Sequence, residues 1–263
     1  MTAIPRKKHN AFAKICQLAG RAVEMYDMIR AEDRIVIGLS WGQDSTVLTH
    51  VLHRLREKAP FHFDLHAVWV DGGFNAGEAP RLQAYAEEHS WSLEIVRLPI
   101  TEILRDKGNE ETPCSLCARL RRGKLHGVMD RIGYKTLALG QHRDDLVTTF
   151  LMSAFRGSGL MTMGPHVPAD RGRKRLIRPL CLASKPLIAE AVEEMGLPII
   201  AKCPYIDQLD ETGDRAYVER LLDELEGHYP GVRHALRRSL SDLRPPHLMD
   251  PRFNDLIRKT TRA

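Results

Sequence analysis

Hydrophobic residues along this chain follow two patterns, short continuous runs and longer stretches with helical spacing. The runs are rich in β-branched residues and predict strands at 34–39, 63–70, 92–97, 135–139 and 197–200. Apolar residues three and four positions apart predict helices between or beside them, at about 44–58, 77–89, 115–132, 143–156 and 184–196. This alternation predicts an α/β fold in which helices cover both faces of a doubly wound, mainly parallel sheet.

Helical patterns also flank this core. Residues 11–30 have the spacing of an amphipathic helix, and two further helices are expected at 213–226 and 232–243. The proline-containing stretch 164–178 is expected to be a loop or hairpin rather than core. We therefore divide the chain into an N-terminal helical segment, a nucleotide-binding α/β domain and a C-terminal helical extension, at 1–32, 33–200 and 201–263.

Composition places the chain among ordinary globular proteins. Its 263 residues are 43% hydrophobic and 28% charged, and no apolar run is long enough to span a membrane. The N-terminus lacks the apolar region of a secretion signal, and five cysteines, an odd number, argue against a disulfide framework. We expect a cytoplasmic protein. The net charge of +5, with basic clusters at 119–124 and 171–175, favours a polyanionic partner.

A loop of small residues ends the first predicted strand and leads directly into a helix. It contains Ser40, Gly42 and Ser45, and the helical pattern continues from Val47. At such a turn, unpaired backbone N–H groups and the positive end of the helix dipole favour an anion. An ordinary strand-to-helix turn explains this segment, taken alone, equally well. The Gly-Lys-Ser/Thr of the common P-loop is absent, so this is not that nucleotide site.

Acidic residues follow another strand end, in the sequence Gly140-Gln-His-Arg-Asp-Asp145. Asp144 or Asp145 is suited to capping the helix that begins here, which is a structural role. Beside a phosphate loop, an acid at a strand end can also hold Mg²⁺ or orient a nucleotide. His142, taken alone, is typical of a packing or surface histidine.

Two cysteines, Cys114 and Cys117, are spaced to bind one metal ion. The pattern alone is compatible with a redox pair, half a zinc site or the ligands of an iron–sulfur cluster. No second Cys-x-x-Cys follows, and Cys203 is the remaining candidate. Three cysteines suit a 4Fe-4S cluster with one iron left for a non-protein ligand. We expect Cys16 and Cys181 to be buried small side chains, with Cys181 as the alternative to Cys203.

Together these segments resemble the PP-loop ATP pyrophosphatase superfamily and, within it, the TtcA-like tRNA thiolation enzymes (the tRNA 2-thiocytidine synthetase family). The resemblance covers about residues 34–246, and the cysteine segment is its most specific match. The segments that carry it are Ser40-x-Gly42-x-Asp44-Ser45, Cys114-Ser-Leu-Cys117-Ala-Arg-Leu-Arg-Arg-Gly123, Gly140-Gln-His-Arg-Asp-Asp145, Phe155-x-Gly157 and Ile177-Arg-Pro-Leu180. The form Cys203-Pro-Tyr205 is more similar to the wider group of cluster-dependent tRNA thiolases.

The chain departs from this family in the anion-binding loop. Trp41 and Gln43 stand where the family has the second glycine and the lysine of Ser-Gly-Gly-Lys-Asp-Ser. Tryptophan is expected to place a bulky ring beside the loop, and glutamine supplies a neutral donor instead of a positive charge. Gln141 replaces the first histidine of the family's adenine-side segment. ATP use is therefore expected to be weakened, shifted to another nucleotide, or dependent on Arg121 and Arg122 for charge.

The resemblance implies sulfur transfer to a pyrimidine base of tRNA that depends on ATP, Mg²⁺ and a 4Fe-4S cluster. The C2 carbonyl oxygen would be adenylated, with release of pyrophosphate, and then replaced by sulfur. Catalytic roles are implied for Asp44, Arg121 and Asp145. Nucleotide binding is implied for Ser40, Gly42, Gln43, Asp44, Ser45, Gly140 and His142. The cluster ligands implied are Cys114, Cys117 and Cys203.

The implied partners are tRNA, a sulfur donor such as a cysteine desulfurase and a second copy of the chain, with no membrane. The target base has to leave its stack, which is easiest in a single-stranded loop. Three alternatives stay open. The first is a lysidine-type tRNA modification without sulfur, and the second is sulfur transfer to another acceptor. The third is an iron–sulfur protein with a degenerate loop and no enzymatic activity, which binds RNA or has a regulatory role. The cysteines count against the first, whereas Trp41 and Gln43 keep the third in consideration.

Overall fold

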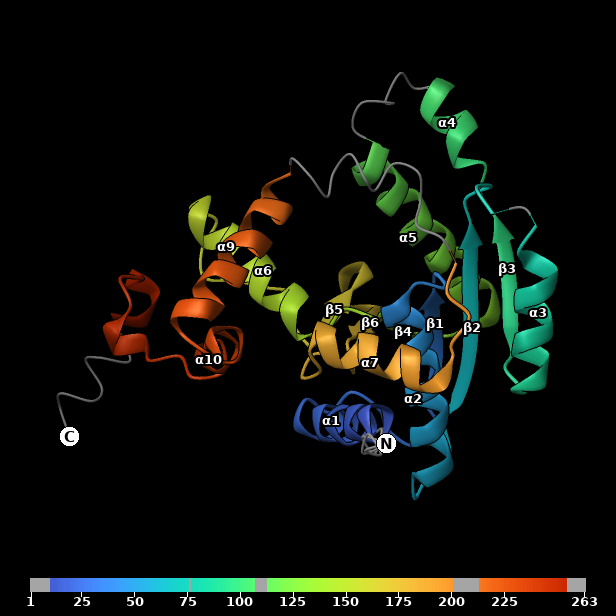
Figure 1. The fold of residues 1–263 in the computed structure, drawn as a ribbon, viewed down its shortest axis with the longest axis horizontal. Helices are drawn as coiled ribbons and strands as arrows, with labels where there is room; N and C mark the ends of the chain where they lie inside the picture. The colour runs from blue at the N-terminus through green and yellow to red at the C-terminus, as the bar shows by residue number, and fades with distance from the viewer. Residues whose placement is uncertain (1–9, 76, 107–112, 201–212, 255–263) are drawn as a thin grey trace, which may run out of the picture.

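The computed structural model of the chain describes residues 10–75, 77–106, 113–200 and 213–254 (Figure 1). They form a six-stranded sheet in the order β3-β2-β1-β4-β6-β5. The strands are β1 (Arg34–Leu39), β2 (Asp64–Asp71), β3 (Leu93–Arg97), β4 (Thr136–Ala138), β5 (His166–Ala169) and β6 (Lys174–Ile177). All neighbours pair in parallel except β5, which lies antiparallel to β6 at one edge. The predicted mainly parallel sheet is confirmed.

Helices cover both faces of this sheet. The structure contains α1 (Ala11–Met25), α2 (Gln43–Lys58), α3 (Ala79–Glu88), α4 (Ile100–Asp106), α5 (Pro113–Ile132), α6 (Arg143–Phe155), α7 (Lys185–Met195), α9 (Asp214–His228) and α10 (Val232–Ser239), with short 3-10 turns at Asp170–Gly172, Pro245–His247 and Pro251–Phe253. Alternate residues of β1 enter two different cores. Ile35 and Ile37 pack in a core that includes residues of α1, α2 and α7, whereas Val36 packs with residues of α5.

The order of the strands places a crevice between β1 and β4. The chain runs outward from β1 to β2 and β3, and then returns to add β4 on the other side of β1. At such a reversal the loops after the two central strands separate, and ligands of α/β sheets bind there. The loops that follow β1 and β4 are the two segments 40–45 and 140–145, so the topology brings both to one edge.

The C-terminal helices form a separate lobe on one side of the sheet, where α9 and α10 lie against α6 (Figure 1). A small hydrophobic core joins them, with Val147 from α6 and Val218 and Leu222 from α9 fully or almost fully buried. The lobe thus contacts the sheet domain through a helix that begins in the crevice. The division of the chain at 32/33 and 200/201 stays a prediction.

One predicted strand is wrong. Residues 197–200 are not in a strand, and the backbone N–H of Ile200 instead donates to the Trp41 carbonyl at 3.0 Å. The strand beside β4 is β6, inside the stretch expected to be a loop or hairpin; the hairpin is present, but β6 belongs to the core. Strand β6 was not predicted because its first two residues, Lys174 and Arg175, are charged. In the structure the buried Lys174 Nζ lies 2.7 Å from Asp130 Oδ1, and Arg175 pairs with Asp33. In the segment 197–200, Pro198 lacks the backbone N–H that a central strand donates to its neighbour, which argues against a strand there.

Helix ends differ slightly from the expected positions. The first helix stops at Met25 rather than residue 30, because the chain turns at Asp27, whose φ is 47°. Helix α4 was not predicted. Among the described residues, every helix is too short or too polar to cross a bilayer.

Candidate functional site

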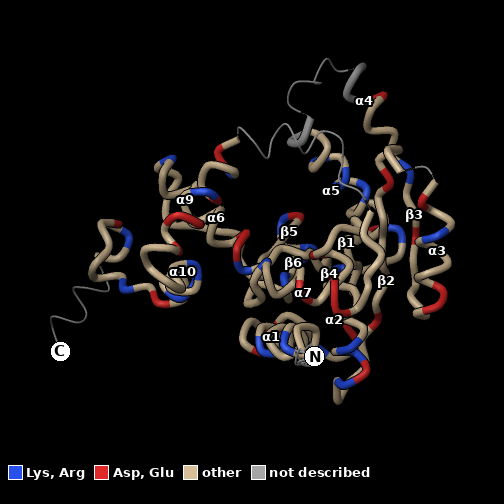
Figure 2. The backbone as a smooth tube through the Cα atoms, viewed as in Figure 1, with Lys and Arg blue, Asp and Glu red and all other residues tan. Residues whose placement is uncertain are grey.

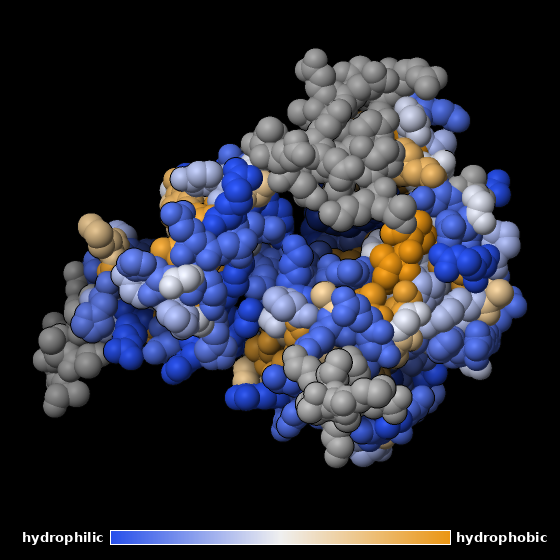
Figure 3. Space-filling model, viewed as in Figure 1, coloured by the Kyte–Doolittle hydropathy of each residue, from blue (hydrophilic) through white to orange (hydrophobic). Residues whose placement is uncertain are grey.

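A cavity of about 940 Å³ opens at the crevice between β1 and β4. The loop after β1 forms one wall, residues of α9 form the opposite wall, and Trp69, Val70 and Ile200 add an apolar side. In Figure 3 the hollow lies between a hydrophilic surface on the side of α9 and a hydrophobic patch beside β2. Of the residues predicted for the site, the cavity is lined by Ser40, Gly42, Gln43, Asp44, Arg121, His142 and Asp145. Ser45 is buried beneath the loop.

The loop after β1 is held in shape by its two serines. The Ser40 N–H donates to Ser45 Oγ at 3.0 Å, and the two hydroxyl oxygens are 2.9 Å apart. Ser45 Oγ also lies 3.2 Å from the Gly42 carbonyl, to which it donates. Gly42 is the N-cap residue of α2 and has no side-chain acceptor for the first-turn N–H groups. Those groups are the donors that an anion takes at a helix N-terminus.

Trp41 does not place its ring beside the anion site, which corrects the sequence-based expectation. The side chain is completely buried in the main core. Its ring stacks on Trp91, with 6.2 Å between ring centroids, and packs edge to face with Tyr85, with 6.0 Å between centroids. The backbone of Trp41 has φ 58°, the left-handed conformation that suits glycine. The turn therefore keeps a glycine-like backbone, while the ring points away from the cavity.

Gly140 brings the loop after β4 against the start of α2. A Cβ atom at this position would lie 3.0 Å from the Asp44 carbonyl carbon and 3.0 Å from the Ser45 nitrogen. Both are backbone atoms, which cannot move aside as a flexible side chain can. The structure thus gives Gly140 a packing role, and it does not line the cavity. Its proposed contact with a nucleotide stays a prediction.

His142 connects the two loops. It is the N-cap residue of α6, and its Nδ1 accepts from the Asp145 N–H at 3.4 Å while Asp145 Oδ2 accepts from the His142 N–H at 3.0 Å. An accepting Nδ1 carries no hydrogen, which leaves the hydrogen on Nε2. Nε2 lies 3.6 Å from Asp44 Oδ1 and 3.5 Å from Asp145 Oδ2. The histidine expected to be a packing or surface residue is therefore buried between the two carboxylates of the cavity.

The Asp44 carboxyl is partly buried and lies close to a second acid, Asp145. Burial raises the pKa of the Asp44 carboxyl above its usual value; the neighbouring His142 opposes this rise, and the charge of Asp145 adds to it. An additional cation between the carboxylates would relieve this repulsion. Mg²⁺ is commonly held by one or two carboxylates together with substrate phosphates, so the pair fits such an ion. The described residues contain no cluster of three or more His, Cys, Asp or Glu that could hold a metal.

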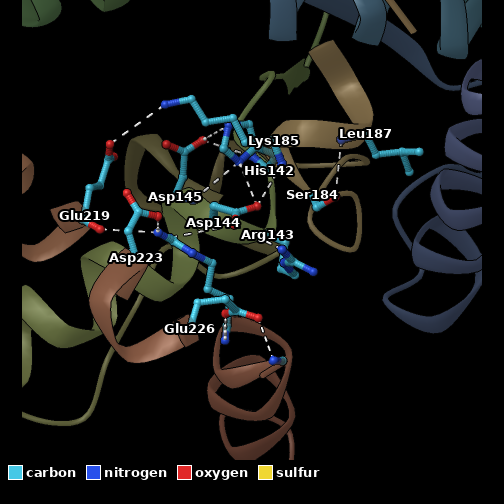
Figure 4. A network of polar contacts seen from close by, with 12 residues as sticks. His142, Arg143, Asp144, Asp145, Ser184, Lys185, Leu187, Glu219, Asp223 and Glu226 are labelled. Atoms are coloured by element: carbon cyan, nitrogen blue, oxygen red, sulfur yellow. Dashed lines mark hydrogen bonds and ion pairs between the residues drawn. The ribbon is translucent and has the colours of Figure 1, made fainter. Parts of the chain in front are cut away.

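The helix-capping role considered from the sequence belongs to Asp145, which accepts from the backbone N–H of the N-cap residue His142. Asp144 has a different structural role. It is buried, and its Oδ2 accepts from the Lys185 backbone N–H at 2.9 Å (Figure 4). Its Oδ1 lies 3.1 Å from Arg143 Nη2 and 3.8 Å from Nη1 of Arg233 on α10. One carboxylate thus joins the starts of α6 and α7 to the C-terminal lobe.

The structure adds cations that the sequence did not single out. Arg215 on α9 forms an ion pair with Asp145, and its Nε lies 3.4 Å from Glu219 Oε1. Lys185, at the start of α7, also lines the cavity, with its Nζ 3.8 Å from Glu219 (Figure 4). No sequence signal distinguished these residues, because Arg215 is 70 residues from its partner in a helix with many charges.

Of the two arginines expected to supply charge, only one lines the cavity. Arg121 on α5 does, and its Nε is buried without a hydrogen-bond partner. A buried N–H group of this kind is suited to receive an anion. Arg122 is exposed and does not line the cavity.

The cysteines are only partly within the described structure. Cys117, on α5, is half-buried against the second core. The side chain of Cys114 and the whole of Cys203 lie outside the described residues. Cys181 is buried as expected, and burial raises the pKa of its thiol to about 12, which disfavours the thiolate that a metal needs. The burial of Cys181 counts against it as the alternative to Cys203, and the choice between the two stays a prediction. Cys16 is half-buried.

Comparisons with known proteins show the family to which the chain belongs. The model of the PP-loop domain matches residues 10–201. A tRNA-cytidine(32) 2-sulfurtransferase of Pelobacter propionicus is 36% identical over 247 residues, covering 93% of this chain and 91% of the relative. One of Geobacter metallireducens is 35% identical, covering 91% and 93%. The U34-tRNA thiolase NcsA from Methanococcus maripaludis, solved with its [4Fe-4S] cluster, has a TM-score of 0.69 and 21% identity, covering 89% of this chain and 80% of that chain. This last likeness shows the fold alone.

Replacing Trp41 tests how the loop is anchored. Trp41→Ala is expected to lower the free energy of unfolding by about 3 to 5 kcal/mol, because a fully buried ring is removed. Trp41→Gly is expected to cost roughly 1 kcal/mol less than Trp41→Ala, because glycine adopts the left-handed backbone without strain. Chemical denaturation followed by circular dichroism measures both. Gln43→Ala, at the exposed neighbour, is the control and changes stability by less than about 0.5 kcal/mol. Equal stability of the Ala and Gly variants would contradict the strain argument.

Proposed function

The chain belongs to the PP-loop domain family, and from this premise we propose that it is a tRNA-cytidine 2-sulfurtransferase. The observation that carries the proposal is the length of the similarity: relatives of that name match over more than nine-tenths of both chains. The names of these relatives give cytidine 32 of tRNA as the substrate, and we propose the same base here. Sulfur transfer is favoured over a lysidine-type reaction and over a binding protein without activity for the same reason.

The cavity supplies the groups that the first half of this reaction needs. The phosphates of ATP would lie at the start of α2, on the loop with Ser40, Gly42, Gln43 and Ser45. Asp44 and Asp145 would hold Mg²⁺, which would neutralise phosphate charge; the position of both carboxylates beside His142 supports this assignment. The C2 oxygen of the base attacks the α-phosphorus, and pyrophosphate leaves. The oxygen is then part of a good leaving group, and AMP departs when sulfur attacks C2.

The second half of the reaction requires a source of sulfur. A 4Fe-4S cluster held by three cysteines would supply an open iron position at which sulfur can be carried. We propose Cys114, Cys117 and Cys203 as its ligands. The position of Cys117 supports this proposal, because it lies one helical turn before Arg121, which lines the cavity.

Further partners follow from the proposed chemistry. Sulfur has to be delivered, and we propose a cysteine desulfurase as the donor. Because the substrate is tRNA, we place the enzyme in the cytoplasm. We also propose that it is a homodimer.

Loss and rescue of the modified base test the function. In a deletion strain, 2-thiocytidine is expected to disappear from tRNA and to return with the wild-type chain but not with Cys117→Ala, because the cluster loses a ligand. Mass spectrometry of tRNA nucleosides measures this. Cys16→Ala, at a half-buried cysteine of α1, is the matched control and restores the base. Anaerobically purified wild type should absorb visible light and Cys117→Ala should not. An unchanged nucleoside profile in the deletion strain would contradict the proposal.

The charged residues around the cavity indicate which basic side chain contacts the triphosphate of ATP. The loop 40–45 contains one charged residue, Asp44, so the loop itself adds only negative charge. Arg215 is held beside the Mg²⁺ position by its ion pair with Asp145. We propose that Arg215 supplies the positive charge to the polyphosphate that Gln43 does not supply, with Arg121 contributing from the other side.

This assignment predicts a loss and a rescue. Arg215→Met is expected to weaken ATP binding at least about tenfold, because a charge-assisted hydrogen bond contributes roughly 1.5 to 3 kcal/mol, and to change AMP binding little. Adding Gln43→Lys is expected to restore part of the ATP affinity, because residue 43 lines the same cavity. Isothermal titration calorimetry measures both. Arg156→Met, which removes an exposed arginine–aspartate ion pair between α6 and α9 outside the cavity, is the control. Unchanged ATP affinity in Arg215→Met would refute the role of Arg215, whereas a wild type that binds no ATP would refute the proposed function.

A further inference from the structure

A second hollow, of about 340 Å³, lies between α1 and α10. Leu18 and Met25 of α1 and Leu182 give it an apolar part. Its charged side chains are mostly positive: Arg21 from α1, and Arg237 and Arg238 from the last turn of α10. We refer to it as the basic groove, defined by these three arginines. In Figure 2, Lys and Arg positions appear on both helices.

The three arginines of the basic groove have no anionic partner. Within the described parts of the chain, none of them forms an ion pair, and none of their guanidinium groups makes a hydrogen bond. This contrasts with Arg215 of α9 and with Arg233 of α10 itself, each of which contacts more than one acidic side chain. The one acid that lines the groove, Asp242, instead pairs with Arg244 at 3.3 Å.

Positive charge is thus concentrated in a concave surface without compensation. His234 of α10 also lines the groove, and burial, with Arg237, Arg143 and Arg238 nearby, lowers its pKa. Clefts lined by one sign of charge focus the field and attract a polyanion. The arrangement requires a ligand with several negative charges in a row, because its arginines come from two helices.

We infer that the basic groove binds the sugar–phosphate backbone of the RNA substrate, outside the cavity in which the base reacts. This inference rests on the proposed function, which makes tRNA the substrate. Arginine forks match phosphate oxygens with two hydrogen bonds, and most contacts that position a nucleic acid go to its backbone. Position is also favourable, because α10 packs on α6 and α9, the helices that carry Asp145 and Arg215 of the cavity. RNA in the groove would therefore contact the same lobe that closes the reaction site.

The double variant Arg237→Gln/Arg238→Gln tests this contact in the full-length protein. It is expected to bind unmodified tRNA about tenfold or more weakly, and the dependence of log affinity on log salt should become shallower by about 1 for each arginine removed. Fluorescence anisotropy with labelled tRNA at several salt concentrations measures both quantities. ATP binding by calorimetry should be unchanged, because neither arginine lines the cavity. Thermal unfolding monitors the fold.

A matched control removes the same charge elsewhere. Arg30→Gln/Arg81→Gln eliminates two exposed arginines that pair with acids on their own turns, and it should keep tRNA affinity within about twofold. An equal loss in this control would overturn the inference, because it would show a response to net charge alone. Unchanged affinity and slope in the groove variant, a loss of its ATP binding, or a wild type that binds no tRNA would also overturn it. If the groove variant loses tRNA binding as expected but the deletion strain keeps its thionucleosides, the inference stands and the proposed function fails.

Discussion

The site depends on one close approach of backbone to backbone, between Gly140 and the first turn of α2. A Cβ at Gly140 would lie 3.0 Å from the Asp44 and Ser45 backbone, a distance so short that one of the two backbone segments would have to shift. This contact sets the distance between the loop after β1 and the loop after β4, and therefore between the carboxylates that those loops carry. His142 then spans the remaining gap, within 3.6 Å of both Asp44 and Asp145. A nucleotide site in this protein is thus a product of how two parallel strands and two helix N-termini are stacked.

The anion-binding loop is anchored from below as well as from the side. Trp41 adopts a glycine-like backbone and sends its ring into the core, where aromatic side chains of α3 and the following turn surround it. The Trp41 carbonyl also accepts from the Ile200 N–H, which ties the loop to the end of the α/β domain. A bulky residue at position 41 is therefore compatible with an open phosphate position, because the Trp41 ring points into the core while its backbone keeps the glycine-like shape of the turn.

Periodicity and strand-end chemistry predicted most of the sheet, the two loops and the part of the cavity wall that these loops form, because these follow from local sequence. What failed required tertiary information. Strand β6 begins with Lys174 and Arg175, which are compatible with burial only because Asp130 and Asp33 come from distant segments. The direction of the Trp41 ring depends on a pocket formed by Tyr85 and Trp91. Arg215 is a surface-like residue in its own helix, and only the fold places it on Asp145.

Asp145 holds two structural partners, and this has a thermodynamic consequence for the proposed metal site. One oxygen accepts from the His142 backbone, and the other pairs with Arg215 of the C-terminal lobe. A metal ion held at this carboxylate, as proposed for Mg²⁺, would compete with one of those partners, so its affinity and the position of α9 would be linked. Linkage of this kind is reciprocal: a ligand that holds the lobe in place alters the binding of the metal, and the metal alters the binding of that ligand by the same factor. A single side chain would then couple the binding of a metal to the position of the C-terminal lobe.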